Sequence, residues 1–406
     1  MTVPESDKDA KPSCSPPARP RIFISAAEPS GDRHAAGLVR EIRRLCPKAH
    51  LFGVAGPAMQ AAGCLAIDDL TSKSAMLVGA LRLLRHARRL MRQISRILAA
   101  TPVDLAIVVD SPALHLPMAK RLRKAGCPVL YYIAPQLWAW APWRIRRLRR
   151  RVNRVAAILP FEEGYFRQRG VDARYVGHPL VEQLADYNPD HTLLAAMRQA
   201  GSPVVTCLPG SRSHVIQEVL PGQIEVARTI AEHHPRAVFL FAAADARASA
   251  IIREFLPTDN LNCRVEIGHL PEMLSASDLA LCASGTATLE VACHGVPMIV
   301  MYNGSKWGYR LVGRHLITTP HLSLVNILAG RRIVPEFMPY YDSTEPIAAE
   351  ALDILANPAR QEAIKTDLAR IVNSLGTSRA AEQAARMAVE MIGSEPAASY
   401  NNSDAG

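Results

Sequence analysis

The residues best suited to chemistry stand in the segment ASGTATLEVACHGVP, residues 283–297, directly after a short apolar run. The pattern predicts a strand that turns into a helix, with Ser284, Gly285 and Thr286 at the helix N-terminus. Backbone N–H groups have no partner within the helix there, and Gly285 lets a ligand come close to the backbone. We therefore expect phosphate binding at this turn, although a capped helix in any α/β domain would produce the same pattern.

Two further features favour a nucleotide as the ligand of this half. Glu290 lies one turn into the predicted helix, and its carboxylate can accept hydrogen bonds from the hydroxyl groups of a ribose. Earlier in the chain, the strand-like run of residues 204–208 ends in a Pro-Gly-Ser-Arg turn. Gly210 and Ser211 would offer N–H groups to a phosphate there, and Arg212 a planar fork of donors.

Asp110 is the candidate for acid–base chemistry. The near-continuous apolar run of residues 103–109 is typical of a buried parallel strand, and it ends in Asp110, Ser111 and Pro112. Functional groups of open α/β sheets gather at such carboxyl ends, so we expect a carboxylate at the mouth of a cleft. A helix N-cap before Pro112 is the structural alternative.

Alternating strands and helices must position these groups. In the first half, apolar or β-rich runs predict strands at 21–26, 51–54, 103–109, 129–133 and 155–159. In the second half, the corresponding runs are 204–208, 238–241, 265–267, 279–282 and 298–301, and the C-terminal third is mostly helical. Alternating βα units predict parallel sheets, and 406 residues suffice for two domains with a core each. The first turn lacks the G-x-G-x-x-G pattern of a dinucleotide site.

Positive charge is concentrated in one part of the chain. The formal net charge is +10, but residues 70–161 contain 18 Lys and Arg and only two acids, Asp104 and Asp110. Such a concentration of positive charge predicts an anionic partner, which would be a nucleic acid, a phospholipid surface or a phosphorylated substrate.

Residues 74–98 predict a basic amphipathic helix, the shape of an element that lies on a membrane surface. We assign its start to lipid, with apolar and basic side chains from Met76, Leu77, Leu81, Leu84, Arg82 and Arg85. A core-packing helix with a solvated face is the alternative, above all for the later turns.

The loop APQLWAWAPW, residues 134–143, holds three of the four tryptophans, and seven arginines follow between 144 and 154. Aromatic side chains beside a basic helix could stack on bases or sugars, or lie at a lipid interface. No nucleic-acid motif surrounds these arginines, and the tryptophans cluster in one loop, so we do not expect nucleic acid as the partner.

Several classes of protein are disfavoured by composition. The eight cysteines are scattered without metal-ligand spacing, which indicates reduced thiols in a cytosolic protein and no metal site. Residues 1–20 contain five prolines and no apolar core, which indicates a disordered tail and not a signal peptide. No apolar run reaches the ~18 to 20 residues of a membrane span, so we expect a soluble or peripheral protein.

The order of the motifs along the chain is more specific than any one of them. They are AAEPSGD (26–32), FGVAGPAMQAAGC (52–64), VVDSP (108–112), YYIAPQLWAW (131–140), LPFEEGYF (159–166), VGHPL (176–180), LPGSR (208–212), ASGTATLE (283–290) and SLVNILAGR (323–331). In this order the chain resembles the lipid-A-disaccharide synthase family over roughly residues 20–395. The resemblance implies an α/β protein with the glycosyltransferase B fold, in which two Rossmann-like domains face a central cleft and the C-terminal helix returns to the N-terminal domain.

Composition along the chain, together with the resemblance, predicts the extent of each domain. We expect a disordered tail at 1–20, an acceptor-binding and membrane-associating domain at 21–180, a UDP-sugar-binding domain at 181–375, a helix packing back on the N-terminal domain at 376–395, and a disordered tail at 396–406.

The implied reaction is an inverting glycosyl transfer without metal or cofactor. UDP-2,3-diacylglucosamine would donate its sugar to the 6-hydroxyl of 2,3-diacylglucosamine 1-phosphate (lipid X), giving UDP and the β-1,6 disaccharide 1-phosphate from which the lipid A of lipopolysaccharide is made. Asp110 matches the family's catalytic aspartate and would take the hydroxyl proton, and Glu28 matches a second important acidic position.

The resemblance assigns two further groups of residues. The donor group would bind UDP and stabilise its leaving phosphate; its members are Gly210, Ser211, Arg212, Ser284, Gly285, Thr286, Ala287, Glu290 and Asn326, of which the last two match the nucleoside end. The acceptor or cleft group is Ser30, Gly31, Asp32, Gln136, Trp138 and His178. The membrane partner would be the anionic inner face of the cytoplasmic membrane.

Some positions depart from the family's pattern. Ala113, Leu114 and His115 stand where the family usually has Asp, Phe and Asn. Val215 replaces a Glu, and Asn303 replaces an Arg. These departures leave Asp110 and the phosphate-binding turns in place, and they bear on acceptor identity and rate.

Two other functions are compatible with the same fold. A nucleotide-sugar epimerase would convert UDP-N-acetylglucosamine without an acceptor, and a non-catalytic membrane-bound homologue would bind UDP-sugar and release no UDP. The basic amphipathic helix argues against the epimerase, since a soluble sugar needs no membrane anchor.

Overall fold

The computed structural model describes residues 19–70, 80–139, 142–185, 187–256, 261–304 and 319–393, and it describes side chains in these ranges except at 80–85 and 87. The two predicted disordered tails therefore fall almost wholly outside the described residues. The chain divides into two compact units. The first holds Met1–Leu137, Pro142–Glu182 and Thr377–Gly406, and the second holds Trp138–Ala141 and Gln183–Gly376.

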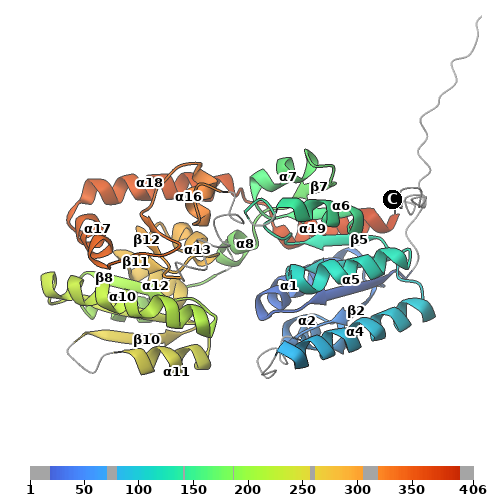
Figure 1. Cartoon of the computed structure of the whole chain (residues 1–406), viewed down its shortest axis with the longest axis horizontal. Helices are drawn as coiled ribbons and strands as arrows, with labels where there is room; N and C mark the ends of the chain where they lie inside the picture. The colour runs from blue at the N-terminus through green and yellow to red at the C-terminus, as the bar shows by residue number, and fades with distance from the viewer. Residues whose placement is uncertain are drawn as a thin grey trace, which may run out of the picture. The chain divides into compact units, whose positions relative to one another are not determined.

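The first unit is built on a parallel sheet of seven strands in the order β3-β2-β1-β4-β5-β6-β7 (Figure 1). The strands are β1 (Arg21–Ala26), β2 (His50–Val54), β3 (Leu65–Asp68), β4 (Leu105–Val109), β5 (Val129–Tyr132), β6 (Arg154–Ala157) and β7 (Ala173–Tyr175). The helical elements are α1 (Pro29–Leu45), α2 (Pro57–Ala61), α4 (Ala80–Ala100), α5 (Pro112–Lys124), η1 (Pro142–Arg144), α6 (Ile145–Arg151), α7 (Pro160–Arg167), α8 (Pro179–Ala185), which continues into the second unit, and α19 (Ala380–Gly393).

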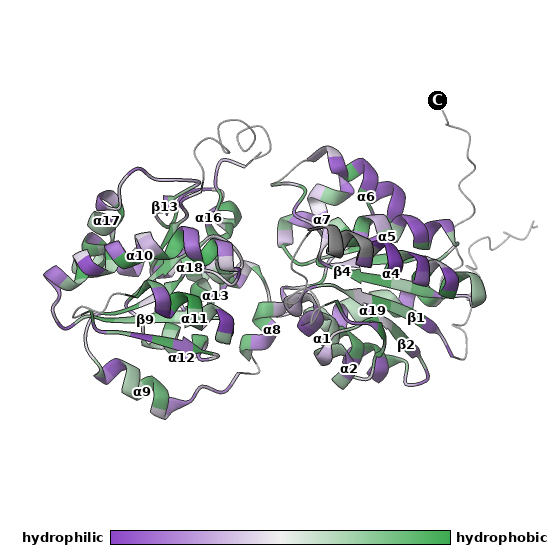
Figure 2. Ribbon diagram, turned by 60° about the horizontal axis from the view of Figure 1, so that its bottom comes forward, coloured by the Kyte–Doolittle hydropathy of each residue, from purple (hydrophilic) through white to green (hydrophobic). Residues whose placement is uncertain are grey.

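Both faces of this sheet are buried, which explains why its strands read as continuous apolar runs. Ile22 and Ile24 of β1 belong to the core beneath α1 and α19, whereas Phe23 between them belongs to the core beneath α4 and α5. Figure 2 shows the resulting pattern, with hydrophobic strands inside and hydrophilic residues on the outer helices. A parallel sheet covered on both sides has no solvent-exposed face, so the sequences of its strands do not alternate between apolar and polar residues.

The C-terminal helix α19 packs against α1, the first helix of the chain. A Cβ placed on Gly37 of α1 would lie 3.4 Å from the Cβ of Ala381, and Ala384, Ala385 and Ala388 of α19 are buried. Small residues on both helices allow this close approach. The C-terminal helix thus returns to the N-terminal unit, as the predicted fold requires.

The second unit has a parallel sheet of six strands in the order β10-β9-β8-β11-β12-β13. The strands are β8 (Val204–Leu208), β9 (Val238–Ala243), β10 (Cys263–Ile267), β11 (Leu279–Cys282), β12 (Met298–Met301) and β13 (Glu336–Phe337). The helices are α9 (His191–Gln199), α10 (Ser213–His233), α11 (Ala246–Phe255), α12 (Leu270–Ala276), α13 (Ala287–Cys293), α16 (Leu324–Ala329), α17 (Glu345–Ala356) and α18 (Pro358–Ser374). Two parallel sheets with helices between their strands confirm the predicted α/β fold class.

Candidate functional site

The predicted acid–base residues lie at the same edge of the first sheet. Ala26, the last residue of β1, pairs with Val109, the last residue of β4. Glu28 and Asp110 follow two and one residues later, so both stand at the carboxyl edge of neighbouring strands. A Cβ on Gly31 would lie 3.8 Å from the carbonyl oxygen of Val109, which places the first turn of α1 beside the end of β4.

Asp110 has an unusual backbone. Its φ is 54°, and that of Ser111 is 44°, so two consecutive non-glycine residues adopt the left-handed conformation. Such residues cost of order 1–3 kcal/mol each and persist only where their surroundings enforce them, most often at functional sites. The carbonyl oxygen of Asp110 accepts hydrogen bonds from the Tyr131 hydroxyl at 2.7 Å and from Nδ1 of His115 at 2.6 Å. Sequence reasoning missed Tyr131 as part of this site.

Asp32 stabilises a neighbouring turn. Its buried carboxylate accepts hydrogen bonds from the backbone amides of Gly56, Ala58 and Met59 at 2.9–3.2 Å, which caps the start of α2. The carboxylate is therefore engaged within its own unit and holds the β2–α2 turn against α1. Its predicted contact with the acceptor stays a prediction.

The other predicted acceptor residues of the first half differ in exposure. Gln136 is exposed after β5, Ser30 is half-buried on α1, and Trp138 is buried in the chain segment that belongs to the second unit. His178 is buried, and its Nδ1 accepts a hydrogen bond from the amide of Leu180 at 3.2 Å. Its Nε2–H group has no partner among the described residues.

Three histidines of the first unit have lowered pKa values because burial penalises the charged imidazole. The pKa of His34, His115 and His178 falls from 6.5 to about 4; the nearby Arg33 also lowers that of His34, and His34 that of His178. Between pH 6.5 and 4 the unfolded chain thus binds more protons at these positions than the folded chain does.

We expect the free energy of unfolding to fall as pH decreases through this window, by up to about 1.4 kcal/mol per pH unit for each histidine. Urea unfolding at pH 7.5, 6 and 5 measures this slope. His34→Gln should reduce it. Equal slopes for His34→Gln and wild type would contradict the assignment.

The second unit brings the two predicted phosphate turns, residues 209–212 and 283–287, together. β8 and β11 are parallel neighbours, and the amide of Ala283 donates to the carbonyl of Leu208 at 2.8 Å. A Cβ on Gly210 would lie 3.9 Å from the Cβ of Ala283 and only 2.7 Å from Val215. Because Gly210 also has φ of 107°, Val215 and the backbone together require glycine at this position.

The turn at 284–287 presents backbone donors. Gly285 has φ of 137°, and a Cβ placed there would meet none of the described atoms within 4 Å. In the part of the chain that the structure describes, the amides of Ser284 to Ala287 donate to no protein acceptor, and the first amide engaged is that of Thr288. Glu290 is half-buried one turn later on α13. Arg212 is exposed at the start of α10.

Asn326 is fully engaged by its own unit. Its Oδ1 accepts from the amides of Ile333 and Val334 at 2.8 and 3.1 Å, and its Nδ2 donates to the Val334 carbonyl and to Glu336. Glu336 also accepts from the amide and hydroxyl of Ser323, and hydrogen bonds from Ser323 and Asn326 lower its pKa against the opposing effect of burial. This geometry gives Asn326 a structural role, and its predicted contact with a nucleoside stays a prediction.

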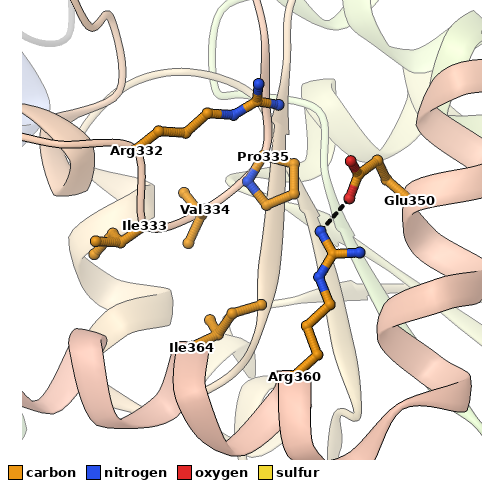
Figure 3. A pocket seen from close by; sticks show the side chains of 7 residues that line it. All are labelled: Arg332, Ile333, Val334, Pro335, Glu350, Arg360 and Ile364. Carbon is orange, nitrogen blue, oxygen red and sulfur yellow. Dashed lines mark hydrogen bonds and ion pairs between the residues drawn. The ribbon is translucent and has the colours of Figure 1, made fainter.

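The same network shapes the wall of a cavity of about 210 Å³ in the second unit (Figure 3). The backbone that Asn326 holds contributes Ile333, Val334 and Pro335 to the lining. On the far side Arg360 makes ion pairs with Glu350 and Asp353, so its charge is compensated. The described lining contains none of the predicted site residues.

The predicted lipid-binding segment is described only in part. Met76 and Leu77 lie outside the described residues, and Leu81, Arg82, Leu84 and Arg85 lie on α4 with their side chains undescribed. No helix in the described ranges has an apolar stretch long enough to cross a membrane.

Comparison with known proteins identifies the relatives of this chain. The family model described as lipid-A-disaccharide synthetase matches residues 22–391. The lipid-A-disaccharide synthase of Geobacter sulfurreducens is 36% identical over 380 residues, which cover 92% of this chain and 98% of that protein.

Solved structures support the fold alone, because their sequence identity is low. The UDP-GlcNAc 2-epimerase of Neisseria meningitidis aligns with a TM-score of 0.57 at 14% identity and covers 92% of this chain and 99% of that one. A glycotransferase of kitacinnamycin aligns with a TM-score of 0.58 at 12% identity, covering 94% and 100%. Given the match over nearly the whole described sequence, the chain belongs to the lipid-A-disaccharide synthase family of glycosyltransferases.

Proposed function

We propose that this chain condenses UDP-2,3-diacylglucosamine with 2,3-diacylglucosamine 1-phosphate through Asp110 as the base and the two phosphate turns as the UDP site. Family membership carries the synthase activity itself. Two observations support the assignment of roles to residues. Glu28 and Asp110 follow the ends of neighbouring strands in the first sheet, and residues 209–212 and 283–287 follow the ends of neighbouring strands in the second.

On the acceptor side, Asp110 takes the proton of the 6-hydroxyl as its oxygen attacks the anomeric carbon of the donor sugar. Attack from the face opposite UDP inverts the anomeric centre and produces the β linkage. General-base catalysis of this kind contributes typically 10²–10⁴-fold. Glu28, at the end of the neighbouring strand, orients the acceptor.

On the donor side, the bond between the anomeric carbon and the β-phosphate oxygen breaks, and negative charge builds on UDP. The amides of residues 284–287 and the guanidinium of Arg212 stabilise this charge. The exposed position of Arg212 and the open space at Gly285 support these roles. Glu290, one turn further on, accepts hydrogen bonds from the ribose.

The test is an assay of UDP release by the purified chain. UDP should form only when both acylated glucosamine substrates are present, and a disaccharide 1-phosphate should appear in equal amount. UDP-N-acetylglucosamine alone should remain unconverted. An epimer in that second reaction would favour the epimerase, and binding of UDP-sugar without UDP release would favour the non-catalytic homologue.

We assign membrane binding to α6 of the first unit as well as to the start of the helix at residues 74–98. Trp143 of η1, the turn that precedes this helix, is 56% exposed, and Arg146, Arg147 and Arg150 are exposed on α6. Figure 2 shows the hydrophilic surface of α6. An exposed indole beside several guanidinium groups suits the boundary of an anionic bilayer, where substrates with acyl chains and phosphates reside.

We expect Arg146→Glu, Arg147→Glu and Arg150→Glu together to abolish sedimentation with phosphatidylglycerol vesicles, since each basic side chain near such a surface contributes about 1 kcal/mol. The matched control reverses Arg228, Arg236 and Arg253, three exposed arginines of the second unit, and should still bind. Equal binding to neutral phosphatidylcholine vesicles by the wild type would remove the electrostatic explanation.

A further inference from the structure

In the first unit, β1 and β5 lie on either side of β4, and each of them carries a polar side chain next to it. Ser25 of β1 pairs in register with Val108 of β4, and Val108 pairs with Tyr131 of β5. Residues paired in this way point to the same face of a parallel sheet. Ser25 and Tyr131 therefore flank β4 on the face that α5 covers, two residues before Asp110.

His115 of α5 completes this arrangement. Its side chain is fully buried, with Nδ1 2.6 Å from the carbonyl oxygen of Asp110 and Nε2 2.9 Å from Oγ of Ser25. The Tyr131 hydroxyl donates to the same carbonyl oxygen at 2.7 Å. Both lone pairs of that oxygen are thus engaged, one by Tyr131 of β5 and the other by His115 of α5.

The chemistry of the groups determines where the protons lie. A carbonyl oxygen only accepts hydrogen bonds, so Nδ1 of His115 must carry a proton. Burial keeps the imidazole neutral, because it lowers the pKa to about 4. Nε2 is then an acceptor, and the Ser25 hydroxyl donates to it. The pKa of Tyr131 is raised by burial, so its hydroxyl also remains a donor.

We propose that Ser25, His115 and Tyr131 are positioning residues that form a clamp on Asp110. His115 and Tyr131 hold the carbonyl of Asp110, Ser25 holds the ring of His115, and together they aim the carboxylate of Asp110 at the acceptor hydroxyl. The backbone of Asp110 and Ser111 is left-handed, and the Cβ direction of Asp110 follows from that backbone. Release of the carbonyl would let the peptide relax to a common conformation and turn the carboxylate away. This proposal rests on the proposed function, in which Asp110 is the base.

The same geometry predicts the effect of an asparagine at position 115. Nδ1 of histidine and Nδ2 of asparagine are the same number of bonds from the backbone, so both can donate to the Asp110 carbonyl. Only histidine has a second nitrogen that reaches Ser25. His115→Asn therefore keeps the essential donor and loses only the outer hydrogen bond.

Steady-state kinetics of the full chain with both lipid substrates tests the clamp. His115→Leu and Tyr131→Phe should each lower kcat by roughly tenfold to a hundredfold, with KM changed less than about twofold, because misplacement of a reacting group by about 1 Å costs that much. Ser25→Ala should lower kcat less, and His115→Asn should remain within about threefold of wild type. Tyr132→Phe, the same change on the opposite face of β5, should have no effect.

A double variant separates this proposal from the proposed function. His115→Leu acts through Asp110, so it should cause no further loss of kcat in an Asp110→Asn background. The clamp would be overturned if His115→Leu lowered kcat equally in the wild-type and Asp110→Asn backgrounds. It would also be overturned if folded His115→Leu and Tyr131→Phe kept the wild-type kcat. Either result would leave Asp110 as the base. Wild-type turnover of Asp110→Asn would instead remove Asp110 as the base in the proposed function. If His115→Leu does not fold, Tyr131→Phe and Ser25→Ala, which each delete one oxygen, decide the question.

Discussion

Asp110→Asn should lower kcat by about 10²–10⁴-fold, the usual contribution of a general base. The amide keeps the size of the side chain and cannot take the proton of the 6-hydroxyl. Because the backbone strain at residues 110–111 is maintained by Tyr131 and His115 through the carbonyl, the substitution leaves that clamp intact. Thermal unfolding should therefore stay close to that of wild type.

Two further variants test whether the loss of kcat is specific to Asp110. Asp172→Asn changes an exposed aspartate that pairs with Arg154 in the same unit, and it should retain full activity. Glu28→Gln should lower kcat less than Asp110→Asn if Glu28 only orients the acceptor. A larger loss for Glu28→Gln, together with loss of the acidic limb of the pH–rate profile, would transfer the role of base to Glu28.

Arg212→Ala should lower kcat/KM for the UDP-sugar by about 10²–10³-fold, because a preorganised donor aimed at developing phosphate charge has an effect of that size. Arg212→Lys should recover only part of the loss, since an ammonium group lacks the planar fork of a guanidinium. The quantity to measure is the initial rate of UDP release at varied donor concentration.

The matched control is Arg236→Ala. Arg236 is also an exposed arginine of the second unit, but it precedes β9 at the amino edge of the sheet, whereas Arg212 follows β8 at the carboxyl edge. This control should keep wild-type kcat/KM. If Arg212→Ala and Arg236→Ala behave alike, the turn at 209–212 is not the site of phosphate stabilisation.

The elements that carry the site were largely predictable because their signals are local. The apolar run before Asp110 indicates a buried parallel strand, and the glycines at 210 and 285 indicate turns that a side chain would obstruct. β3 and β13 gave no clear signal, since runs of four and two residues are too short for periodicity to emerge.

The roles of polar side chains depended on contacts between distant parts of the chain. Asp32 matches a motif, yet its carboxylate caps a turn 24 to 27 residues away. Asn326 matches a motif as well, but its amide and Glu336 hold a loop together. A carboxylate or an amide has the same sequence signature whether it binds a ligand or satisfies backbone amides.

The sequence by itself determined that two parallel α/β sheets would form and that Asp110 and the glycine turns would stand at strand ends, because strand burial and turn formation depend on neighbouring residues. Only the tertiary structure decided that Ser25 and Tyr131, on strands either side of β4, meet His115 around the carbonyl of Asp110. Ser25 and His115 are 90 residues apart, and their hydrogen bond exists only once β1 and β4 are in register beneath α5.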